Sequence, residues 1–281
     1  MTLFRMRPEA VSFFIAAAAL LVMSAAGPAR AGDARFDIPY GRDLAQRIDV
    51  IMPVPPDGKQ RTTIVYFHGG AWALGSRVLE RHVGRALAEM GYVAVLVDYR
   101  LFPFARFPTF VQDGAKAVRW ARDNAKKYGI APNRIYLMGH SAGAHISMLL
   151  ALDPQYLRAV GVPRHAILGA IGLAGPYAKD PLRRAITRPI FAGADRRRAV
   201  NPISVAKNVG PRLLLMHGGA DLLVPPHEAR RFGRAYRAAG GTAVVRVYPG
   251  AGHWQVMLGF EPSQRWRYPV YQDVKRFVGK P

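Results

Sequence analysis

The sequence predicts an α/β fold, with a mostly parallel central sheet and helices on both faces. Short apolar runs rich in β-branched residues, such as Thr62 to Phe67 and Tyr92 to Val97, are typical of buried strands. Runs with apolar residues at helical spacing alternate with them along the chain. Such alternation is typical of parallel strands joined by crossover helices. A chain of 281 residues, half of them hydrophobic, is long enough for one large domain of this class.

The elements follow from periodicity and from turn residues. We expect an irregular polar lead from Asp33, then a strand at Gln46 to Pro53, where apolar residues alternate. Further strands are predicted at Thr62 to Phe67, Tyr92 to Val97, Arg134 to Met138, Ala166 to Leu173, Arg212 to Met216 and Ala243 to Val247. Helices are predicted at Val78 to Met90, Phe110 to Tyr128, Ala144 to Leu152, Pro226 to Ala239 and Pro262 to Val278. Residues 176–210 lack a strong period and are the candidate for a short lid-like insertion.

Residues 1–31 have the layout of a secretory signal peptide. Arg5 and Arg7 form a basic start, residues 11–26 are almost wholly apolar, and Ala29-Arg30-Ala31 offers a cleavage site. We therefore expect a periplasmic or secreted protein, with residues 32–281 as its single domain. The alternative is an uncleaved membrane anchor, because the apolar run is only slightly short of a membrane span.

Composition excludes several kinds of site. The chain has no cysteine, so disulfides, thiolate metal sites and a catalytic thiol are excluded. No pair of histidines with a carboxylate has metal spacing, and no glycine-rich phosphate loop is present, so we predict neither metal nor cofactor. The formal charge of +22 is scattered through helices and loops rather than gathered with aromatics on one element. We expect no nucleic-acid binding, and only loose attraction to anionic surfaces of the cell envelope.

The sequence from Gly139 to Gly143, Gly-His-Ser-Ala-Gly, joins a predicted strand to a predicted helix. At so tight a turn Ser141 must take a strained backbone conformation, and side chains in place of the two glycines would collide with the neighbouring strand and helix. The turn lifts the serine hydroxyl clear of the sheet edge and places the free N–H groups of a helix N-terminus beside it. Ser141 is therefore the candidate nucleophile.

Chemically active residues follow four of the predicted strands. In a parallel sheet the carboxyl ends of the strands meet along one edge, where sites assemble. A serine needs a base to take its proton, usually an imidazole held in one tautomer by a carboxylate. The order of serine, aspartate and histidine along the chain is the one expected for this arrangement. The residues concerned are His68-Gly69-Gly70-Ala71, Ser141, Asp221 and His253.

With these motifs the chain resembles the α/β-hydrolase superfamily, near its HGG-bearing carboxylesterase and lipase branch. The similarity covers nearly all of residues 32–281, and the combination of motifs is specific. The resemblance implies that Ser141 is the nucleophile, His253 the general base and acid, and Asp221 the carboxylate that orients the histidine.

The resemblance also implies an oxyanion hole made by the backbone N–H groups of Gly70, Ala71 and Ala142. Related lipases often carry a third glycine where Ala71 stands. The N–H of an alanine remains usable there provided that φ is negative.

Residues near these motifs are given other roles. Trp72 and His140 are candidates for the wall of the substrate pocket, and both His140 and His145 are expected to line the pocket or to pack rather than to catalyse. We expect His68 to brace the oxyanion loop rather than to react.

Other carboxylates compete with Asp221 for the role of the acid. Asp98 also ends a strand, but it precedes Ser141, and Arg100 close by favours a structural ion pair. Only Asp221 follows a buried strand in a glycine-led loop on the catalytic edge. Asp153 is too remote at the far end of the helix after Ser141, and Glu228 in a first helical turn is explained by the helix dipole. Asp180 and Asp195 lie in the arginine-rich insertion, where solvated ion pairs are expected.

These features favour an exported serine hydrolase that cleaves small-molecule carboxylic esters, with short acyl chains preferred. Relatives that cleave sugar-acetyl or feruloyl esters are included in this expectation. An arylformamidase-like amidase would use the same triad and share the stretch from His68 to Trp72; turnover of N-formylkynurenine against p-nitrophenyl acetate separates the two. A non-catalytic binding protein on the same fold is the alternative from another class.

The signal-peptide interpretation predicts that the exported protein begins at Gly32. N-terminal sequencing of the protein recovered outside the cytoplasm checks the cleavage site after Ala31. Recovery of residues 1–31 in membranes, still attached to the rest of the chain, would show an anchor instead.

Overall fold

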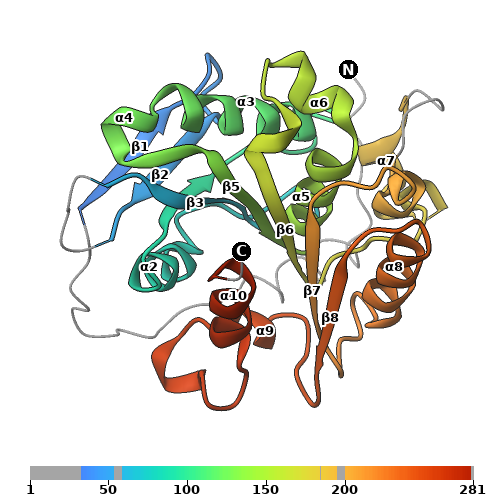
Figure 1. Cartoon of the computed structure of the whole chain (residues 1–281). Helices are drawn as coiled ribbons and strands as arrows, with labels where there is room; N and C mark the ends of the chain where they lie inside the picture. The colour runs from blue at the N-terminus through green and yellow to red at the C-terminus, as the bar shows by residue number, and fades with distance from the viewer. Residues whose placement is uncertain (1–32, 54–58, 184, 195–199, 280–281) are drawn as a thin grey trace. The chain divides into compact units, whose positions relative to one another are not determined.

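The computed structural model describes residues 33–53, 59–183, 185–194 and 200–279. Its centre is an eight-stranded sheet with the order β1-β2-β4-β3-β5-β6-β7-β8 (Figure 1). The pairs β1–β2 and β2–β4 are antiparallel, and all other neighbours are parallel. The predicted α/β class with a mostly parallel sheet is confirmed. The strands are β1 Ala34–Pro39, β2 Arg47–Ile51, β3 Arg61–Phe67, β4 Val93–Val97, β5 Ile130–His140, β6 Ile167–Leu173, β7 Arg212–Gly218 and β8 Ala243–Tyr248.

Helices join these strands and follow the last of them. The α-helices are α2 Arg81–Glu89, α3 Thr109–Asp123, α4 Ala125–Tyr128, α5 Ala142–Leu152, α6 Pro154–Ala159, α7 Arg188–Phe191, α8 His227–Ala238, α9 Gln255–Leu258 and α10 Val270–Gly279. Short 3₁₀ helices are η1 Arg164–Ala166, η2 Pro181–Arg183, η3 Pro202–Val205 and η4 Pro262–Gln264.

Several predicted boundaries were wrong, and three of them have a clear physical reason. The expected irregular lead contains strand β1, whose alternation is hidden by a register shift and by a positive φ of 58° at Asp37. The long helix predicted to reach Tyr128 breaks at Asn124, whose side chain donates to the Trp120 carbonyl. The last helix starts at Val270, because Pro269 cannot lie inside a helix.

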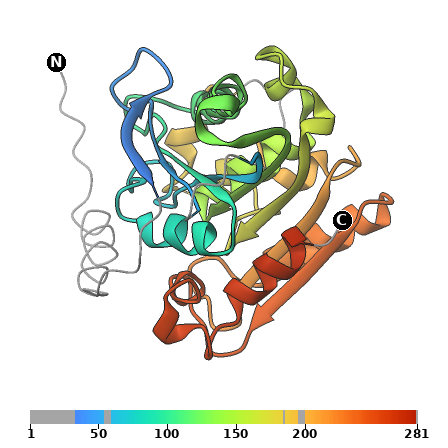
Figure 2. The same ribbon diagram turned by 60° about the vertical axis from the view of Figure 1, so that its left-hand side comes forward.

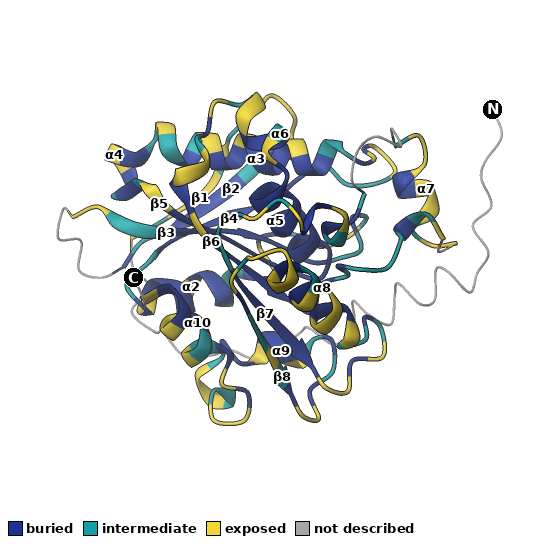
Figure 3. Cartoon of the chain, turned by 45° about the vertical axis from the view of Figure 1, so that its right-hand side comes forward, coloured by how far each residue is buried: buried dark blue, intermediate teal, exposed yellow. Residues whose placement is uncertain are grey.

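The sheet has a separate hydrophobic core on each face. Strand β3 alternates between them: Val65 and Phe67 pack on one side, Ile64 and Tyr66 on the other. The first core includes residues of α3, α5, α6 and α8, and the second includes residues of α2, α9 and α10. Figure 2 shows α2 in teal and α10 in red on the same face. The helices bury the side that faces the sheet and expose the other (Figure 3). Helix α5 is buried along its whole length.

The described part of segment 176–210 contributes to the core. Ile190 and Phe191 in α7 are buried, and Phe191 stacks against Phe107 with ring centroids 5.3 Å apart. The arginine-rich segment is therefore anchored to the core by apolar side chains. Residues 184 and 195–199, which include Asp195, lie outside the described residues.

The expected signal peptide also lies outside the described residues. Among the residues that the structure describes, no helix is both long and apolar enough to cross a membrane.

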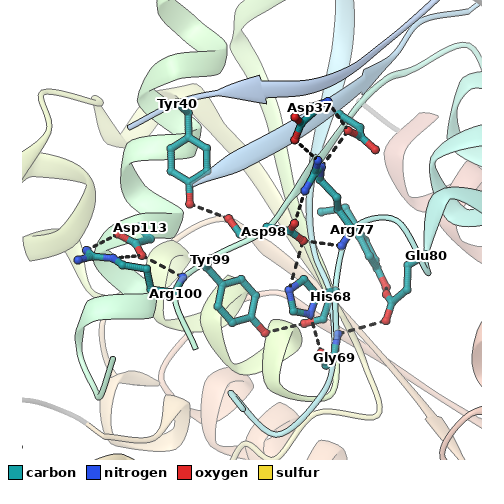
Figure 4. A network of polar contacts seen from close by, with 12 residues as sticks. Asp37, Tyr40, His68, Gly69, Arg77, Glu80, Asp98, Tyr99, Arg100 and Asp113 are labelled. Atoms are coloured by element: carbon teal, nitrogen blue, oxygen red, sulfur yellow. Dashed lines mark hydrogen bonds and ion pairs between the residues drawn. The ribbon is translucent and has the colours of Figure 1, made fainter. Parts of the chain in front are cut away.

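A buried arginine joins strands β1 and β2 to the residue that follows β4. The Arg77 guanidinium pairs with Asp37 (2.7 Å), with Asp49 (2.9 Å) and with Asp98 (Figure 4). Burial alone would raise the pKa of Asp49, but hydrogen bonds from Arg81, the backbone of Asp37 and Arg77 hold this pKa below its usual range. The ion pair expected at Asp98 is thus present, but its partner is Arg77.

The expected partner of Asp98 binds elsewhere. Arg100 donates through Nε and Nη2 to both carboxylate oxygens of Asp113, at 2.8 and 2.7 Å. The partner suggested for Asp98 by its closeness to Arg100 in the sequence was therefore wrong. Asp113 lies on α3 and is fully buried, so it needs a bidentate partner more than the partly exposed Asp98 does.

Because Arg77 is paired with three carboxylates, one of them fully buried, Arg77→Met should be strongly destabilising. We expect a loss of about 3–5 kcal/mol in the free energy of unfolding, the usual cost of removing one partner of a buried ion pair. Urea denaturation followed by circular dichroism measures it. The control is Arg276→Met, which removes an exposed pair with Asp273 and should cost about 0.5 kcal/mol or less. Equal losses in both variants would contradict the assigned role of Arg77.

Candidate active site

The turn from β5 into α5 has the geometry that its glycines imply. Ser141, between the two elements, has φ +53° and ψ −114°, a strained conformation for a residue with a side chain. A Cβ on Gly139 would lie 2.3 Å from the carbonyl carbon of Gly143. A Cβ on Gly143 would lie 2.0 Å from the carbonyl oxygen of Phe67. The predicted steric reason for both glycines is confirmed.

The structure brings together the three side chains singled out from the sequence. His253 Nδ1 lies 2.7 Å from Asp221 Oδ2, and His253 Nε2 lies 3.0 Å from Ser141 Oγ. A carboxylate accepts the proton of Nδ1, which leaves the Nε2 lone pair free to accept the serine O–H. Ser141 follows β5, Asp221 follows β7 and His253 follows β8. All three residues are buried.

Asp221 is held in place by more than the histidine. Its Oδ1 accepts the backbone N–H groups of Leu223 and Val224, at 3.0 and 2.8 Å. Burial alone would raise the pKa of Asp221, but contacts with His217 and His253 and these backbone bonds hold the pKa well below its usual range. Asp221 therefore stays ionised next to the imidazole at neutral pH.

His217 is a member of the site that the sequence analysis did not single out. It is fully buried in β7, its Nε2 donates to the Val224 carbonyl (2.7 Å), and the same nitrogen lies 3.4 Å from Asp221 Oδ2. The signal available in the sequence was the second His-Gly-Gly-Ala, which begins at His217. The structure places this histidine behind the carboxylate, where it limits the positions that Asp221 can adopt.

The loop after β3 presents backbone N–H groups near the start of α5. Among the described residues, no hydrogen bond takes up the N–H of Gly70, Ala71 or Ala142. Ala142 is the first residue of α5, so its N–H has no partner within the helix. The condition of a negative φ at Ala71 is not met, because φ is +51° there and +59° at Trp72, yet the Ala71 N–H remains unpaired among the described residues. The loop thus keeps a glycine-like conformation without the glycine, at a cost of about 1–3 kcal/mol per strained residue.

His68 braces this loop as expected. Its Nδ1 lies 2.6 Å from the Gly69 carbonyl, and its ring stacks on Tyr99 with centroids 4.4 Å apart (Figure 4). Burial lowers the pKa of His68 below its usual value, although Asp98 opposes this. The ring is therefore neutral and Nδ1–H donates to the loop.

The two residues expected to wall the pocket have different positions. Trp72 is only 4% exposed, and it packs edge-on against His145 and Phe191 at 5.0 and 4.9 Å. The pocket prediction for His140 was wrong, because its side chain is fully buried behind His253. His140 Nε2 lies 3.1 Å from the His253 carbonyl, and burial, with His253 near it, lowers the pKa of His140 well below its usual value. His140 is therefore a neutral donor that positions the loop of His253.

Of the two roles expected for His145, pocket lining or packing, the structure shows packing. It lies one turn after Ser141 on α5, and its Nε2 is 2.9 Å from the Val200 carbonyl. Burial lowers the pKa of His145 to about 4, so the ring is neutral in the aromatic cluster with Trp72 and Phe191.

The competing carboxylates are engaged away from His253. Asp153 accepts the N–H of Gln155 at the start of α6, and Asp180 accepts that of Leu182. The explanation of Glu228 by the helix dipole alone was incomplete. It is fully buried, and its Oε2 accepts the N–H groups of Ala178 and Lys179 at 2.7 and 2.9 Å. In the described part of the chain, no three His, Asp or Glu side chains are grouped so as to hold a metal ion.

Two family models match this chain. The model of the prolyl oligopeptidase family matches residues 110–279, and the BD-FAE model matches residues 48–158. Esterase LipC of Mycobacterium tuberculosis is 33% identical, over 76% of this chain and 58% of the relative. A probable isoprenylcysteine alpha-carbonyl methylesterase of Arabidopsis thaliana is 31% identical, over 80% of this chain and 58% of the relative.

Solved structures share the fold at lower identity. Esterase B from Lactobacillus rhamnosis has a TM-score of 0.82 at 19% identity, covering 96% of this chain and 94% of that one. A truncated carbohydrate esterase from gut microbiota has a TM-score of 0.74 at 21% identity, covering 90% and 98%. This chain spans less than two thirds of the length of the curated relatives named above. The match to more than half of the chain by one family model, together with the fold and the strained serine turn, leads to one conclusion. The chain belongs to the prolyl oligopeptidase family of the α/β-hydrolase superfamily, and its curated relatives include esterases.

Proposed function

We propose that the protein is an exported serine hydrolase that cleaves small carboxylic esters through an acyl-enzyme. The observation that carries this proposal is the hydrogen-bonded row from Ser141 through His253 to Asp221. The row lies at the start of α5 and beside a loop whose N–H groups are unpaired among the described residues. Relatives that are named as esterases support the ester bond as the bond that is cleaved.

In the first half of the reaction, Ser141 Oγ attacks the carbonyl carbon of the ester while His253 Nε2 takes the hydroxyl proton. The negative charge that develops on the carbonyl oxygen would be stabilised by the N–H groups of Gly70, Ala71 and Ala142. The C–O bond to the alcohol then breaks, and His253 returns its proton to the leaving oxygen. The acyl group remains bound to Ser141.

In the second half, water replaces the alcohol. His253 Nε2 takes a proton from the water as its oxygen attacks the acyl carbon, and the same N–H groups stabilise the second oxyanion. The bond to Ser141 Oγ breaks, the serine recovers its proton from His253, and the carboxylic acid leaves. Asp221 stays ionised throughout, and it stabilises the imidazolium that forms in each half.

A preference for short acyl chains is part of the proposal. On the side of the oxyanion loop, Trp72 and Phe191 are buried in one aromatic cluster with His145 and Phe110. Side chains already in contact leave little free apolar surface for further methylene groups. We expect kcat/KM on p-nitrophenyl esters to be highest from about acetyl to hexanoyl, since each buried CH₂ contributes about 0.8 kcal/mol only where it finds apolar contacts. A steady rise of kcat/KM out to the palmitoyl ester would contradict this.

The roles in the triad predict graded losses. Ser141→Ala should lower kcat by about 10⁶ and abolish labelling by a fluorophosphonate probe. Asp221→Asn should lower kcat by about 10⁴, because the histidine is then held in the wrong tautomer. Circular dichroism checks that both variants are folded. The control is Asp123→Asn, an exposed aspartate on α3, which should stay within about twofold of wild type. A near-wild-type Asp221→Asn enzyme, or persistent labelling of Ser141→Ala, would disprove the assignment.

A further inference from the structure

Glu80 has a position in which a glutamate is not expected. It stands immediately before α2, at the N-cap, where serine, threonine, aspartate and asparagine are preferred. Its carboxylate caps nothing there. Instead it turns inward, where Oε1 accepts the backbone N–H of Gly69 at 3.3 Å and Oε2 accepts the Tyr66 hydroxyl (Figure 4 draws the bond to Gly69).

The surroundings of this carboxylate contain no charge of opposite sign among the described residues. The titratable groups that act on it or respond to it are Tyr66 on β3 and Tyr99 after β4, both buried and neutral. On the side of α9, the thioether of Met257 lies 3.9 Å from the Tyr66 hydroxyl. His68, next to Gly69, is neutral. Burying a carboxylate without a cation costs free energy of folding. A glutamine could bind the same two partners without that cost. Stability alone therefore does not account for Glu80.

Glu80 acts on the first residue of the oxyanion loop. Gly69 is confined on its other side, since a Cβ there would lie 2.6 Å from His140 Nδ1. The following turn is closed by Ala73 and Leu74, whose N–H groups donate to the Gly70 carbonyl at 3.0 and 2.9 Å. The bond from Gly69 to Glu80 thus sets where the turn begins, and the turn sets where the N–H groups of Gly70 and Ala71 point.

We propose that Glu80 is a positioning residue for the reaction, whose ionised carboxylate holds Gly69 and thereby aligns the N–H groups of Gly70 and Ala71 on the developing oxyanion. This rests on the proposed ester hydrolysis. A carboxylate accepts an N–H more strongly than a neutral acid or amide does. The ionised form is therefore the one that fixes the loop.

The protonation state links this role to pH. Burial raises the pKa of Glu80 from 4.5 to about 7, although the bonds from Tyr66 and Gly69 oppose the rise. The aligned loop is then lost as the pH falls through about 7. The contribution of Glu80 to the free energy of unfolding depends on pH in the opposite sense. Because its pKa is higher in the folded than in the unfolded chain, this contribution is complete below about pH 4.5 and is lost as the pH rises through about 7.

The test compares Glu80→Gln with wild type on p-nitrophenyl acetate. At pH 8.5 we expect kcat to fall about 10-fold, less than the loss of an oxyanion donor itself, with KM within about twofold. At pH 6, where wild-type Glu80 is protonated, the ratio of the two kcat values should shrink to about 2. The melting temperature at pH 8.5 should be equal or higher, because a buried charge is removed. The matched control is Glu89→Gln, an exposed carboxylate on the same helix, which should show no change at either pH.

Several outcomes would overturn the inference. A kcat ratio that is the same at pH 6 and 8.5, or a wild-type kcat in Glu80→Gln, excludes an ionised positioning group. If Glu80→Gln does not fold, Tyr66→Phe decides: it removes a bond that lowers the pKa of Glu80, so the acid limb of kcat should move to higher pH, and an unmoved limb contradicts the inference. Wild type that hydrolyses no ester and takes no fluorophosphonate label would instead reject the proposed function.

Discussion

The start of helix α5 lies against the end of strand β3 with no room for a side chain between them. The ideal Cβ of Gly143 would be 2.0 Å from the Phe67 carbonyl oxygen. Because β3 continues directly into His68, this approach also places the loop that begins at His68 beside the first turn of α5. One steric constraint thus sets both the serine conformation and the distance from the hydroxyl to the N–H groups that would serve it. The packing of the fully buried helix α5 maintains the strained conformation of Ser141.

The loop after β3 is held at both of its ends by buried charge. At its far end, Arg77 is bound by carboxylates from β1, from β2 and from the residue after β4. Arg77 lies three residues before Glu80, so the same cluster fixes the start of α2 and hence the carboxylate that reaches back to Gly69. The two ends differ in charge balance. In the arginine cluster each carboxylate has an arginine partner, whereas Glu80 has no cationic partner among the described residues and its protonation can change near neutral pH.

Local patterns predicted the strands and the helices around Ser141 because their signals are complete within a few residues. The two glycines around Ser141 carry their steric reason in the sequence, and a buried parallel strand is a continuous apolar run. The wrong predictions about side-chain partners concern residues whose partners are remote in sequence. Asp98 pairs with Arg77, 21 residues away, and Glu228 with the N–H of Ala178, 50 residues away. His140 was expected in a pocket, but 113 residues separate it from the carbonyl that it binds.

The sequence by itself determined the α/β class, the serine turn, and the order of Ser141, Asp221 and His253 along the chain. Each of these depends on period, on glycine placement or on strand ends, which are local properties. Only the tertiary structure decided that His217 supports Asp221 and that Ala71 adopts a positive φ. It also decided that Glu80 turns away from its helix. These outcomes depend on which buried polar groups can find partners after the sheet has assembled, and burial makes an unpaired group too costly to leave.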